Sequence, residues 1–202
     1  SQPMGFYAPA EIVRCARDHG VTVLAPDAAF SHWDCTLERD AKGVLCLRLG
    51  FRQIDGFRQD WAALLLSHRF NGYDAMGDIA RRARLPKRAL TILAEADSFQ
   101  SIAMDRREIL WAVRRLPDSE GLPLFEAQYV ESEPAETIAP LPMMPLGEHV
   151  LADYRMLRLS LRAHLMEFLR DLFRGEGALS CEEIATAHDG TRSACAGIVL
   201  TR

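Results

Sequence analysis

An acidic, proline-rich stretch at residues 116–148 constrains the fold of this 202-residue chain more than any other feature. It holds six of the ten prolines and seven acidic residues, but no lysine or arginine. Proline cannot continue a helix or donate to the ladder of a sheet, and like charges along a segment repel one another. We therefore expect a linker or extended arm here, with folded segments on either side.

The two sides of this stretch differ in charge, although the whole chain carries a formal net charge of only −4. Residues 48–115 contain thirteen basic and eight acidic residues, whereas residues 116–202 contain seven and fourteen. A basic half favours a polyanionic partner. Five scattered cysteines without a Cys-x-x-Cys pair indicate reduced thiols in a cytoplasmic protein, and no apolar run approaches the ~20 residues of a membrane-spanning helix.

Glycines and prolines divide the chain into short helical segments, which predicts a mainly α fold with a few short strands. The expected helices cover residues 9–19, 59–69, 73–84, 87–95, 105–115, 148–173 and 181–188, and the expected strands cover residues 22–24, 44–49 and 193–201. In the longest helix, apolar residues from Leu157 to Leu172 would share one face. Because the last strand has no evident partner in the chain, we expect the chain to be part of a longer protein.

Residues 50–58, followed by the apolar helix that contains Trp61, have the form of a helix-hairpin-helix turn. Gly56 would let the main chain approach a phosphate, and the first amides of the next helix would point at that anion. Such a site binds backbone phosphates and reads no base. The alternative is that Gly56 only allows a tight turn between two helices.

A second hairpin at residues 73–95 favours the functional interpretation, because basic residues surround its Leu85-Pro86 turn. Tandem hairpins with basic turns hold a duplex by its backbone. The alternative for Arg81 and Arg82 is a solvated helix face. The candidate DNA-binding residues are Arg52, Gln53, Asp55, Gly56, Phe57, Arg58, Arg84, Lys87 and Arg88.

An apolar tetrapeptide, Leu122-Pro123-Leu124-Phe125, interrupts the acidic stretch. Such a segment can place two or three apolar side chains in a pocket of a partner protein. The alternative is that these residues cover the chain's own core.

A weaker hypothesis is an enzyme built on ligand-type residues at close spacing. Asp74 and Asp78 lie four apart on one helix face, but aspartate in a first helical turn also complements the helix dipole. Two other groups contain residue types that bind metals. One is His32, Asp34 and Cys35, and the other is Cys181, Glu182, Glu183 and His188. Neither group has the distant second pair of ligands that a metal site needs. No glycine-rich phosphate loop, Gly-x-Ser-x-Gly motif or His-Glu-x-x-His motif is present, so we predict neither an active site nor a metal site.

A series of short motifs runs along the whole chain, at residues 2–7, 33–38, 49–57, 85–90, 93–97, 105–113, 144–147, 153–155 and 159–164. In order and spacing they resemble the bacterial C-family DNA polymerases, and among them the error-prone paralogue of the replicative alpha subunit. The resemblance implies four parts: the end of the fingers (1–47), a tandem helix-hairpin-helix domain that binds duplex DNA (48–115), the linker (116–148), and a helical segment that leads into a truncated OB-fold domain (149–202).

The same resemblance implies a non-catalytic role for this segment in translesion synthesis and DNA damage tolerance. In the family, the palm carboxylates that hold two magnesium ions lie upstream, so no cofactor is expected here and no polymerase activity from this chain alone. In replicative relatives a sliding-clamp peptide occupies the position of Leu122 to Phe125, although the leading glutamine is absent here. The implied partners are primer-template DNA, the sliding clamp and other mutasome subunits, in the bacterial cytoplasm at the nucleoid, with no membrane. The alternative is an interaction module that recruits the clamp or a mutasome subunit without binding DNA.

Three positions depart from the pattern of the family. Arg158 stands where the family usually has glycine, Leu165 where it usually has proline, and Ala29 where it usually has asparagine. We expect the local turns to differ at these positions.

Overall fold

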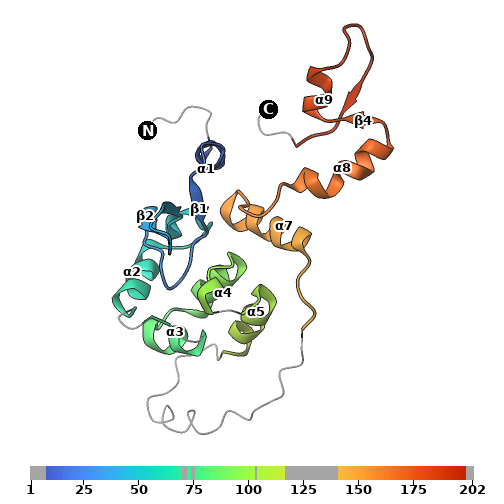
Figure 1. Cartoon of the computed structure of the whole chain (residues 1–202). Helices are drawn as coiled ribbons and strands as arrows, with labels where there is room; N and C mark the ends of the chain where they lie inside the picture. Colours follow the sequence, from blue (N-terminus) through green and yellow to red (C-terminus); the bar gives the residue numbers. More distant parts are fainter. Residues whose placement is uncertain (1–7, 70–71, 74–75, 103, 117–140, 199–202) are drawn as a thin grey trace.

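In the computed structural model, short helices dominate the chain, which confirms the mainly α fold class (Figure 1). The structure describes residues 8–69, 72–73, 76–102, 104–116 and 141–198. Its helices are α1 (Pro9–Asp18), η1 (Phe51–Gln53), α2 (Gln59–Ser67), α3 (Met76–Ala83), α4 (Lys87–Glu95), η2 (Gln100–Ile102), α5 (Arg106–Arg115), α7 (Leu146–Leu157), α8 (Leu165–Gly175) and α9 (Cys181–Ala185). Its strands are β1 (Thr22–Leu24), β2 (Thr36–Arg39), β3 (Leu45–Arg48), β4 (Ala178–Leu179) and β5 (Ala194–Cys195).

A small sheet precedes the hairpin helices, with the strand order β1-β3-β2. Strand β3 pairs in parallel with β1 and antiparallel with β2. Strand β2 was not predicted from the sequence, because its single large apolar residue, Leu37, is 68% exposed and gives no signal of a buried face. The turn after β2 is closed by Asp40, whose Oδ1 accepts hydrogen bonds from the amides of Lys42 and Val44 at 2.9 and 2.8 Å.

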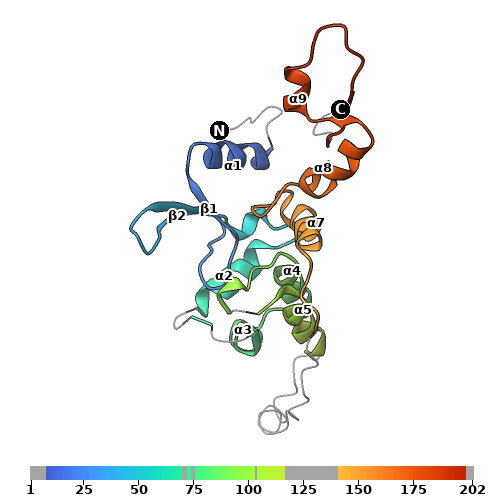
Figure 2. The ribbon, with the colours of Figure 1, turned by 45° about the vertical axis from the view of Figure 1, so that its right-hand side comes forward.

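The main core lies among η1 and helices α2 to α5. One apolar residue from each of these elements is at most 1% exposed: Phe51, Leu65, Ile79, Leu93 and Ile109. The same cluster includes Met156 and Leu157 of α7 and Leu159 just after it. Helix α7 is therefore part of the hairpin core although residues 116–145 separate it from α5 in the sequence, and both ribbon views place it against α4 (Figures 1 and 2).

The single helix predicted for residues 148–173 is wrong, because α7 ends at Leu157 and α8 begins at Leu165. Arg158 adopts a left-handed conformation with φ +60°, which ends α7. The N-cap residue of α8 is His164, whose Nδ1 accepts a hydrogen bond from the amide of Met166 at 3.2 Å. A left-handed position favours glycine, so arginine at position 158 concealed the end of the helix.

The apolar stripe expected on that helix is divided between two environments. Leu157 is 3% exposed within the core, whereas Phe168, Leu169 and Leu172 of α8 are 43%, 42% and 60% exposed. A continuous helical face would have given these residues similar burial.

Two acidic and two basic side chains join α7 to the hairpin helices. Arg106, at the start of α5 and 1% exposed, donates from Nη2 to Asp153 Oδ1 at 2.5 Å and from Nη1 to the carbonyl of His149 at 2.9 Å. Arg162 donates to both Asp153 and Asp97, and Asp97 Oδ1 lies 3.7 Å from Arg106 Nε. Arg106, Asp153 and Asp97 are buried, whereas Arg162 reaches them from the surface. We call these four residues the buried charge network.

The last described residues form a small unit in which β4 pairs in parallel with β5. Leu179 is the register partner of Cys195. The prediction that the last strand has no partner in the chain is therefore wrong, and within the described residues the strand is only Ala194–Cys195. The OB-fold assignment of this part stays a prediction.

The tetrapeptide Leu122-Pro123-Leu124-Phe125 and Asp74 lie outside the described residues. Helix α7 begins at Leu146, inside the stretch assigned to the linker. Within the described ranges, no helix has the length and apolar character needed to cross a membrane.

Candidate nucleic-acid interface

The first hairpin turn connects η1 to α2, and Gly56 lies at its bend. Gly56 has φ +75°, and a Cβ at this position would make only an ordinary contact with Ile92 Cδ1 at 3.8 Å. Glycine is therefore favoured by the backbone conformation and not by crowding. The adjacent Phe57 is 6% exposed, and its ring packs against the rings of Phe51 and Trp61 at centroid distances of 5.5 and 5.6 Å.

The amino end of α2 follows this turn directly. Its N-cap residue, Arg58, makes no capping hydrogen bond with its side chain. The first amides of an α-helix have no acceptor within the helix, and the helix dipole is positive at this end. The turn and helix start have the backbone geometry needed to accept an anion.

Helix α7 fixes the other side of the first turn. The amide of Asp55 donates to the carbonyl of Met156 at 2.7 Å, and Gln53 Nε2 donates to the carbonyl of Leu157 at 3.2 Å. Arg158 Nη2 also pairs with Asp55 Oδ2 at 2.6 Å. Two candidate binding residues, Gln53 and Asp55, therefore hold the turn on α7 instead of offering these groups to a ligand.

The two arginines of the first turn each have an acidic partner. Arg52 Nη1 lies 3.3 Å from Asp34 Oδ1. Arg58 makes two hydrogen bonds to Asp60, at 2.9 and 2.7 Å, and its guanidinium lies 5.2 Å from the centre of the Trp61 ring. All four charged side chains are more than half exposed, so these pairs are weak and open to exchange with another anion.

The second hairpin turn connects α3 to α4. Arg84 has a left-handed conformation with φ +47°, Leu85 is 6% exposed, and Pro86 is the N-cap residue of α4 without a side-chain capping bond. Arg88 lies in the first turn of α4 and is exposed. The second turn therefore combines an uncapped helix start with exposed guanidinium groups.

Lys87 joins this turn to the end of α5. Its ammonium donates to the carbonyls of Arg114 and Leu116 at 3.0 and 2.7 Å. These carbonyls belong to the last turn of α5, where acceptors lack partners within the helix and a cation is favourable. In this structure Lys87 connects α4 to α5.

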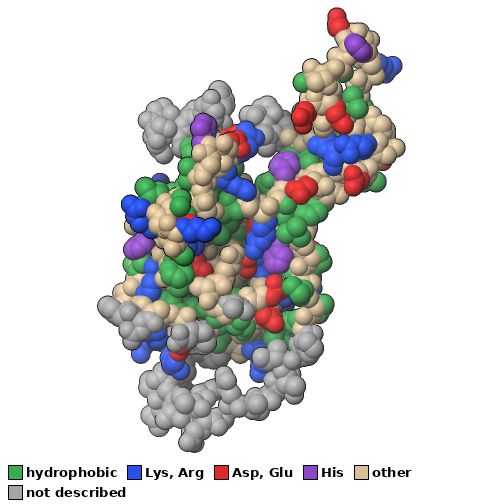
Figure 3. Space-filling view, in the orientation of Figure 1, with side chains coloured by type: hydrophobic (Ala, Val, Ile, Leu, Met, Phe, Trp, Pro, Cys, Tyr) green, Lys and Arg blue, Asp and Glu red, His purple; other side chains and the backbone are tan. Residues whose placement is uncertain are grey.

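This connection brings basic residues of two helices to one end of the hairpin unit. Arg84 and Arg88 come from the α3–α4 turn and Arg114 from α5, and all three are exposed. Within the described parts of the chain, none of the three makes an ion pair. We call Arg84, Arg88 and Arg114 the basic end. The space-filling view shows that Lys and Arg side chains occur at the lower end of the molecule in that orientation (Figure 3).

Sequence reasoning missed Arg114. The only signal was the Arg114-Arg115 pair in the last turn of α5, which is also what a helix needs to balance its dipole. The proximity of α5 to the α3–α4 turn depends on tertiary packing, which residue spacing does not reveal.

Arg81 and Arg82 both have partners within the chain. Arg81 pairs with Asp78 one turn earlier. Arg82 donates to the carbonyls of Gly72 and His68 at 2.8 and 2.7 Å, and its guanidinium lies 5.1 Å from the centre of the Tyr73 ring. These contacts favour a structural role for both arginines.

Among the described residues, the side chains named in the weaker enzyme hypothesis do not form a catalytic or metal-binding arrangement. Asp78 is paired with Arg81, and Asp34 with Arg52. Among the residues that the structure describes, no three His, Cys, Asp or Glu side chains gather as metal ligands would.

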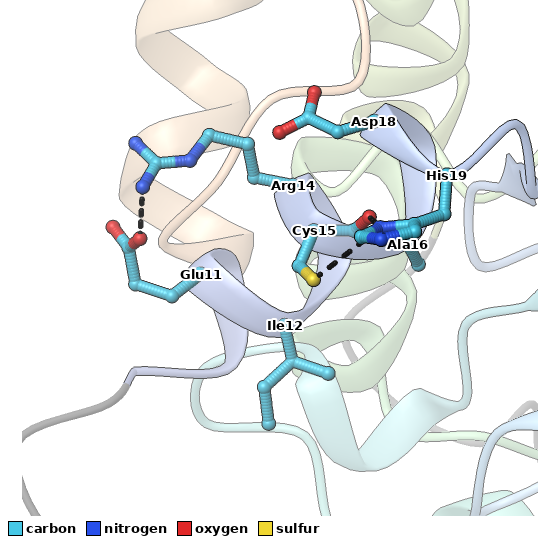
Figure 4. Close-up of a pocket in the computed structure, with 7 residues that line it drawn as sticks. All are labelled: Glu11, Ile12, Arg14, Cys15, Ala16, Asp18 and His19. Atoms are coloured by element: carbon cyan, nitrogen blue, oxygen red, sulfur yellow. Dashed lines mark hydrogen bonds and ion pairs between the residues drawn. The ribbon is translucent and has the colours of Figure 1, made fainter.

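An open pocket of about 570 Å³ lies on the exposed side of α1 (Figure 4). Every residue that lines it belongs to α1 or follows it directly, and no buried residue is found in this helix. Figure 4 shows Cys15 close to His19, with Sγ 3.7 Å from Nδ1, and Arg14 paired with Glu11. A surface formed by one helix offers no opposing groups to hold a substrate, so we assign no chemistry to it.

Comparison with known families supports the hairpin interpretation. A family model described as a helix-hairpin-helix motif matches residues 20–109. The match covers both hairpin turns and the sheet that precedes them, and ends at the start of α5.

Comparison with known proteins finds relatives that are similar over the whole chain. An error-prone DNA polymerase of Rhodopseudomonas palustris (strain HaA2) is 48% identical over 222 aligned residues, and one of Brucella abortus biovar 1 (strain 9-941) is 50% identical over 202. Over its whole length the chain is similar to one segment of these error-prone DNA polymerases. A more distant polymerase of this name, from Bradyrhizobium sp. (strain ORS 278), is 38% identical over 275 residues. Each alignment includes the whole chain, which spans 19% of the first two relatives and 24% of the third.

Proposed function

We propose that this chain is a non-catalytic segment of an error-prone DNA polymerase that binds duplex DNA by its phosphate backbone, independently of base sequence. The observation that carries the proposal is the basic end, where Arg84, Arg88 and Arg114 lie exposed without ion-pair partners in the described residues. Guanidinium groups bind phosphate through paired donors, and such contacts carry no base information.

The first hairpin turn supplies a different kind of contact. A phosphate at the start of α2 would accept hydrogen bonds from main-chain amides beside Gly56, while Arg52 and Arg58 exchange their carboxylate partners for it. The packing of this turn on α7 fixes its backbone before DNA arrives. In this proposal Gln53 and Asp55 are positioning residues and Phe57 anchors the turn in the core.

At the second turn, Arg84 and Arg88 bind one stretch of backbone with the amino end of α4. Lys87 has a positioning role, because its ammonium is already bonded to the end of α5. Arg114 adds a third cation to the same end. Backbone contacts of this kind suit a polymerase segment, which must bind duplexes of any sequence.

Removing these charges tests the proposal. A variant with Arg84→Gln, Arg88→Gln and Arg114→Gln should bind a labelled primer-template duplex much more weakly at low salt, by roughly tenfold for each phosphate that it no longer neutralises. The matched control is Arg17→Gln, because Arg17 is an exposed residue of α1, a helix that lies above the small sheet and away from α3 to α5 (Figure 1). Unchanged affinity of the triple variant would contradict the proposal, as would an equal reduction per charge in the control.

A second candidate is recruitment of a partner protein by Leu122-Pro123-Leu124-Phe125. The sequence observation that favours it is an apolar tetrapeptide within an acidic, proline-rich stretch. The family resemblance implies that a sliding-clamp peptide occupies this position in replicative relatives. Deleting the four residues should abolish binding to the sliding clamp and leave duplex binding intact. Retained clamp binding after the deletion would exclude this candidate.

At the level of the whole protein, we propose translesion synthesis in the bacterial cytoplasm, at the nucleoid, within DNA damage tolerance. Clamp and mutasome subunits are the proposed partners. The magnesium-dependent chemistry of such a polymerase would belong to palm carboxylates elsewhere in the longer protein. A polymerase assay with and without this segment, on one damaged template, tests whether the segment contributes to extension.

A further inference from the structure

Two exposed cysteines lie side by side in the unit formed by β4, α9 and β5. Cys181 is the first residue of α9, and Cys195 is the last residue of β5. Their Sγ atoms are 3.9 Å apart although fourteen positions separate them in the chain. Both thiols are free and exposed.

The surrounding backbone fixes this proximity. Strands β4 and β5 pair so that Cys195 stands opposite Leu179, two residues before Cys181. A capping box sets the start of α9: Ser180 Oγ accepts from the amide of Glu183 at 3.1 Å, and Glu183 Oε2 accepts from the amide of Ser180 at 2.6 Å. The two sulfur atoms are therefore held together by a strand register and a helix cap, and not by the thiols themselves.

The other cysteines have different surroundings. Cys46 is 1% exposed, and its thiol donates to the carbonyl of Val44 at 3.6 Å. Cys15 and Cys35 are exposed, and among the described residues neither has a second sulfur in contact. The arrangement of Cys181 and Cys195 is thus specific to this pair.

We propose that Cys181 and Cys195 are a redox-sensitive pair that forms a reversible disulfide when the protein meets hydrogen peroxide. One thiol attacks the peroxide, which breaks the O–O bond, forms a sulfenic acid and releases one water. The second thiol attacks that sulfur, the S–S bond forms, and a second water leaves with the remaining proton. The two thiols lose two electrons in total, and the peroxide accepts them.

The geometry suits this reaction. The sulfur atoms must approach from 3.9 Å to about 2.05 Å, a movement that rotations of exposed side chains allow. The disulfide would close the segment from α9 to β5 into a covalent ring and join the start of α9 to the end of the sheet.

Tryptic mapping of the whole chain tests the pair. Cleavage after Arg174 and Arg192 places Cys181 and Cys195 in separate peptides, residues 175–192 and 193–202. After treatment with hydrogen peroxide and blocking of free thiols, we expect these peptides to run as one cross-linked species about 2 Da lighter than their sum. Dithiothreitol should separate them again.

The controls distinguish this pair from general oxidation. Cys195→Ser should give no cross-link and leave Cys181 open to a sulfenic-acid trap, while its circular dichroism stays that of the parent. Cys35→Ser, which removes another exposed thiol, should keep the cross-link. Separate peptides from the oxidised parent chain would overturn the proposal, and so would sulfinic acids at the two positions or a covalent dimer in place of the internal bond.

Discussion

Replacing Asp153 with alanine is the sharpest perturbation of the buried charge network. Asp153 is 3% exposed and accepts hydrogen bonds from Arg106, Arg162 and Ser160. The substitution leaves Arg106 almost completely buried, with a bond to the carbonyl of His149 and with Asp97 Oδ1 at 3.7 Å. An incompletely paired charge then remains in the core.

Removal of one partner from a buried ion pair costs about 3 to 5 kcal/mol. Because Asp97 still faces both arginines, we expect the lower end of this range, about 3 kcal/mol. With a urea m-value of about 2 kcal/mol per molar, the unfolding midpoint falls by about 1.5 M. The matched control is Glu148→Ala, also on α7, which breaks the exposed Arg107–Glu148 pair and should cost less than about 1 kcal/mol.

Urea unfolding followed by circular dichroism measures both variants. Hydrogen exchange at the amide of Asp55 gives a local readout, because this amide bonds to Met156 of α7 and should exchange faster when α7 is loosened. The double substitution Arg106→Met with Asp153→Leu should recover most of the stability, since it leaves no unpaired charge. Equal costs for Asp153→Ala and Glu148→Ala would refute the reasoning that this network ties α7 to the hairpins.

Three further predictions concern single positions. Arg158→Gly places glycine at a left-handed position, although it also removes the exposed pair with Asp55. In urea unfolding this variant should be more stable than Arg155→Gly, which places glycine inside helix α7, by at least about 1 kcal/mol. Equal stabilities would contradict the left-handed conformation of residue 158. Burial, and then the charges of Arg106 and Arg162, lowers the pKa of His149, so the unfolded chain takes up the proton first as the pH falls below about 6.5, and the folded state loses stability. His149→Gln should therefore lose less stability than the parent chain between about pH 7 and pH 5.5. If the free energy of unfolding of the two chains falls in parallel over this range, the assignment is contradicted. Gly56→Val should weaken duplex binding while the chain stays folded. The control is Gly43→Val in the β2–β3 turn, where glycine has a similar φ of +79°, and this variant should bind the duplex as the parent chain does. If the two variants bind the duplex with equal affinity, the first hairpin turn has a purely structural role.

Glycine, proline and capping residues at the helix ends made most helices predictable from the sequence. Gly20 follows α1, Pro86 precedes α4, and Asp105 caps α5 with a complete capping box, and the sequence predicted each of these helices to within about two residues. The helix-hairpin-helix form and the polymerase resemblance rested on the same local motifs, and the comparisons confirmed both.

Features that depend on tertiary packing were not predictable. Strand β2 has an exposed Leu37 and gave no alternating pattern, and Arg158 concealed the end of α7 because a left-handed position usually holds glycine. The burial of Arg106 and the role of Lys87 at the end of α5 follow from contacts between segments distant in the chain. Residue spacing along one segment carries no information about such contacts.

Binding of the chain to a labelled primer-template duplex across a salt series tests the central claim most directly. If Arg84, Arg88 and Arg114 each neutralise one phosphate, these three contacts alone should lower the logarithm of the association constant by about 2.7 for each tenfold rise in salt, whatever the base sequence. The variant that lacks these three charges should lose that part of the slope and keep the part that comes from the first hairpin turn. A folded parent chain that binds no duplex even at low salt, or a slope that the three substitutions leave unchanged, would contradict the account.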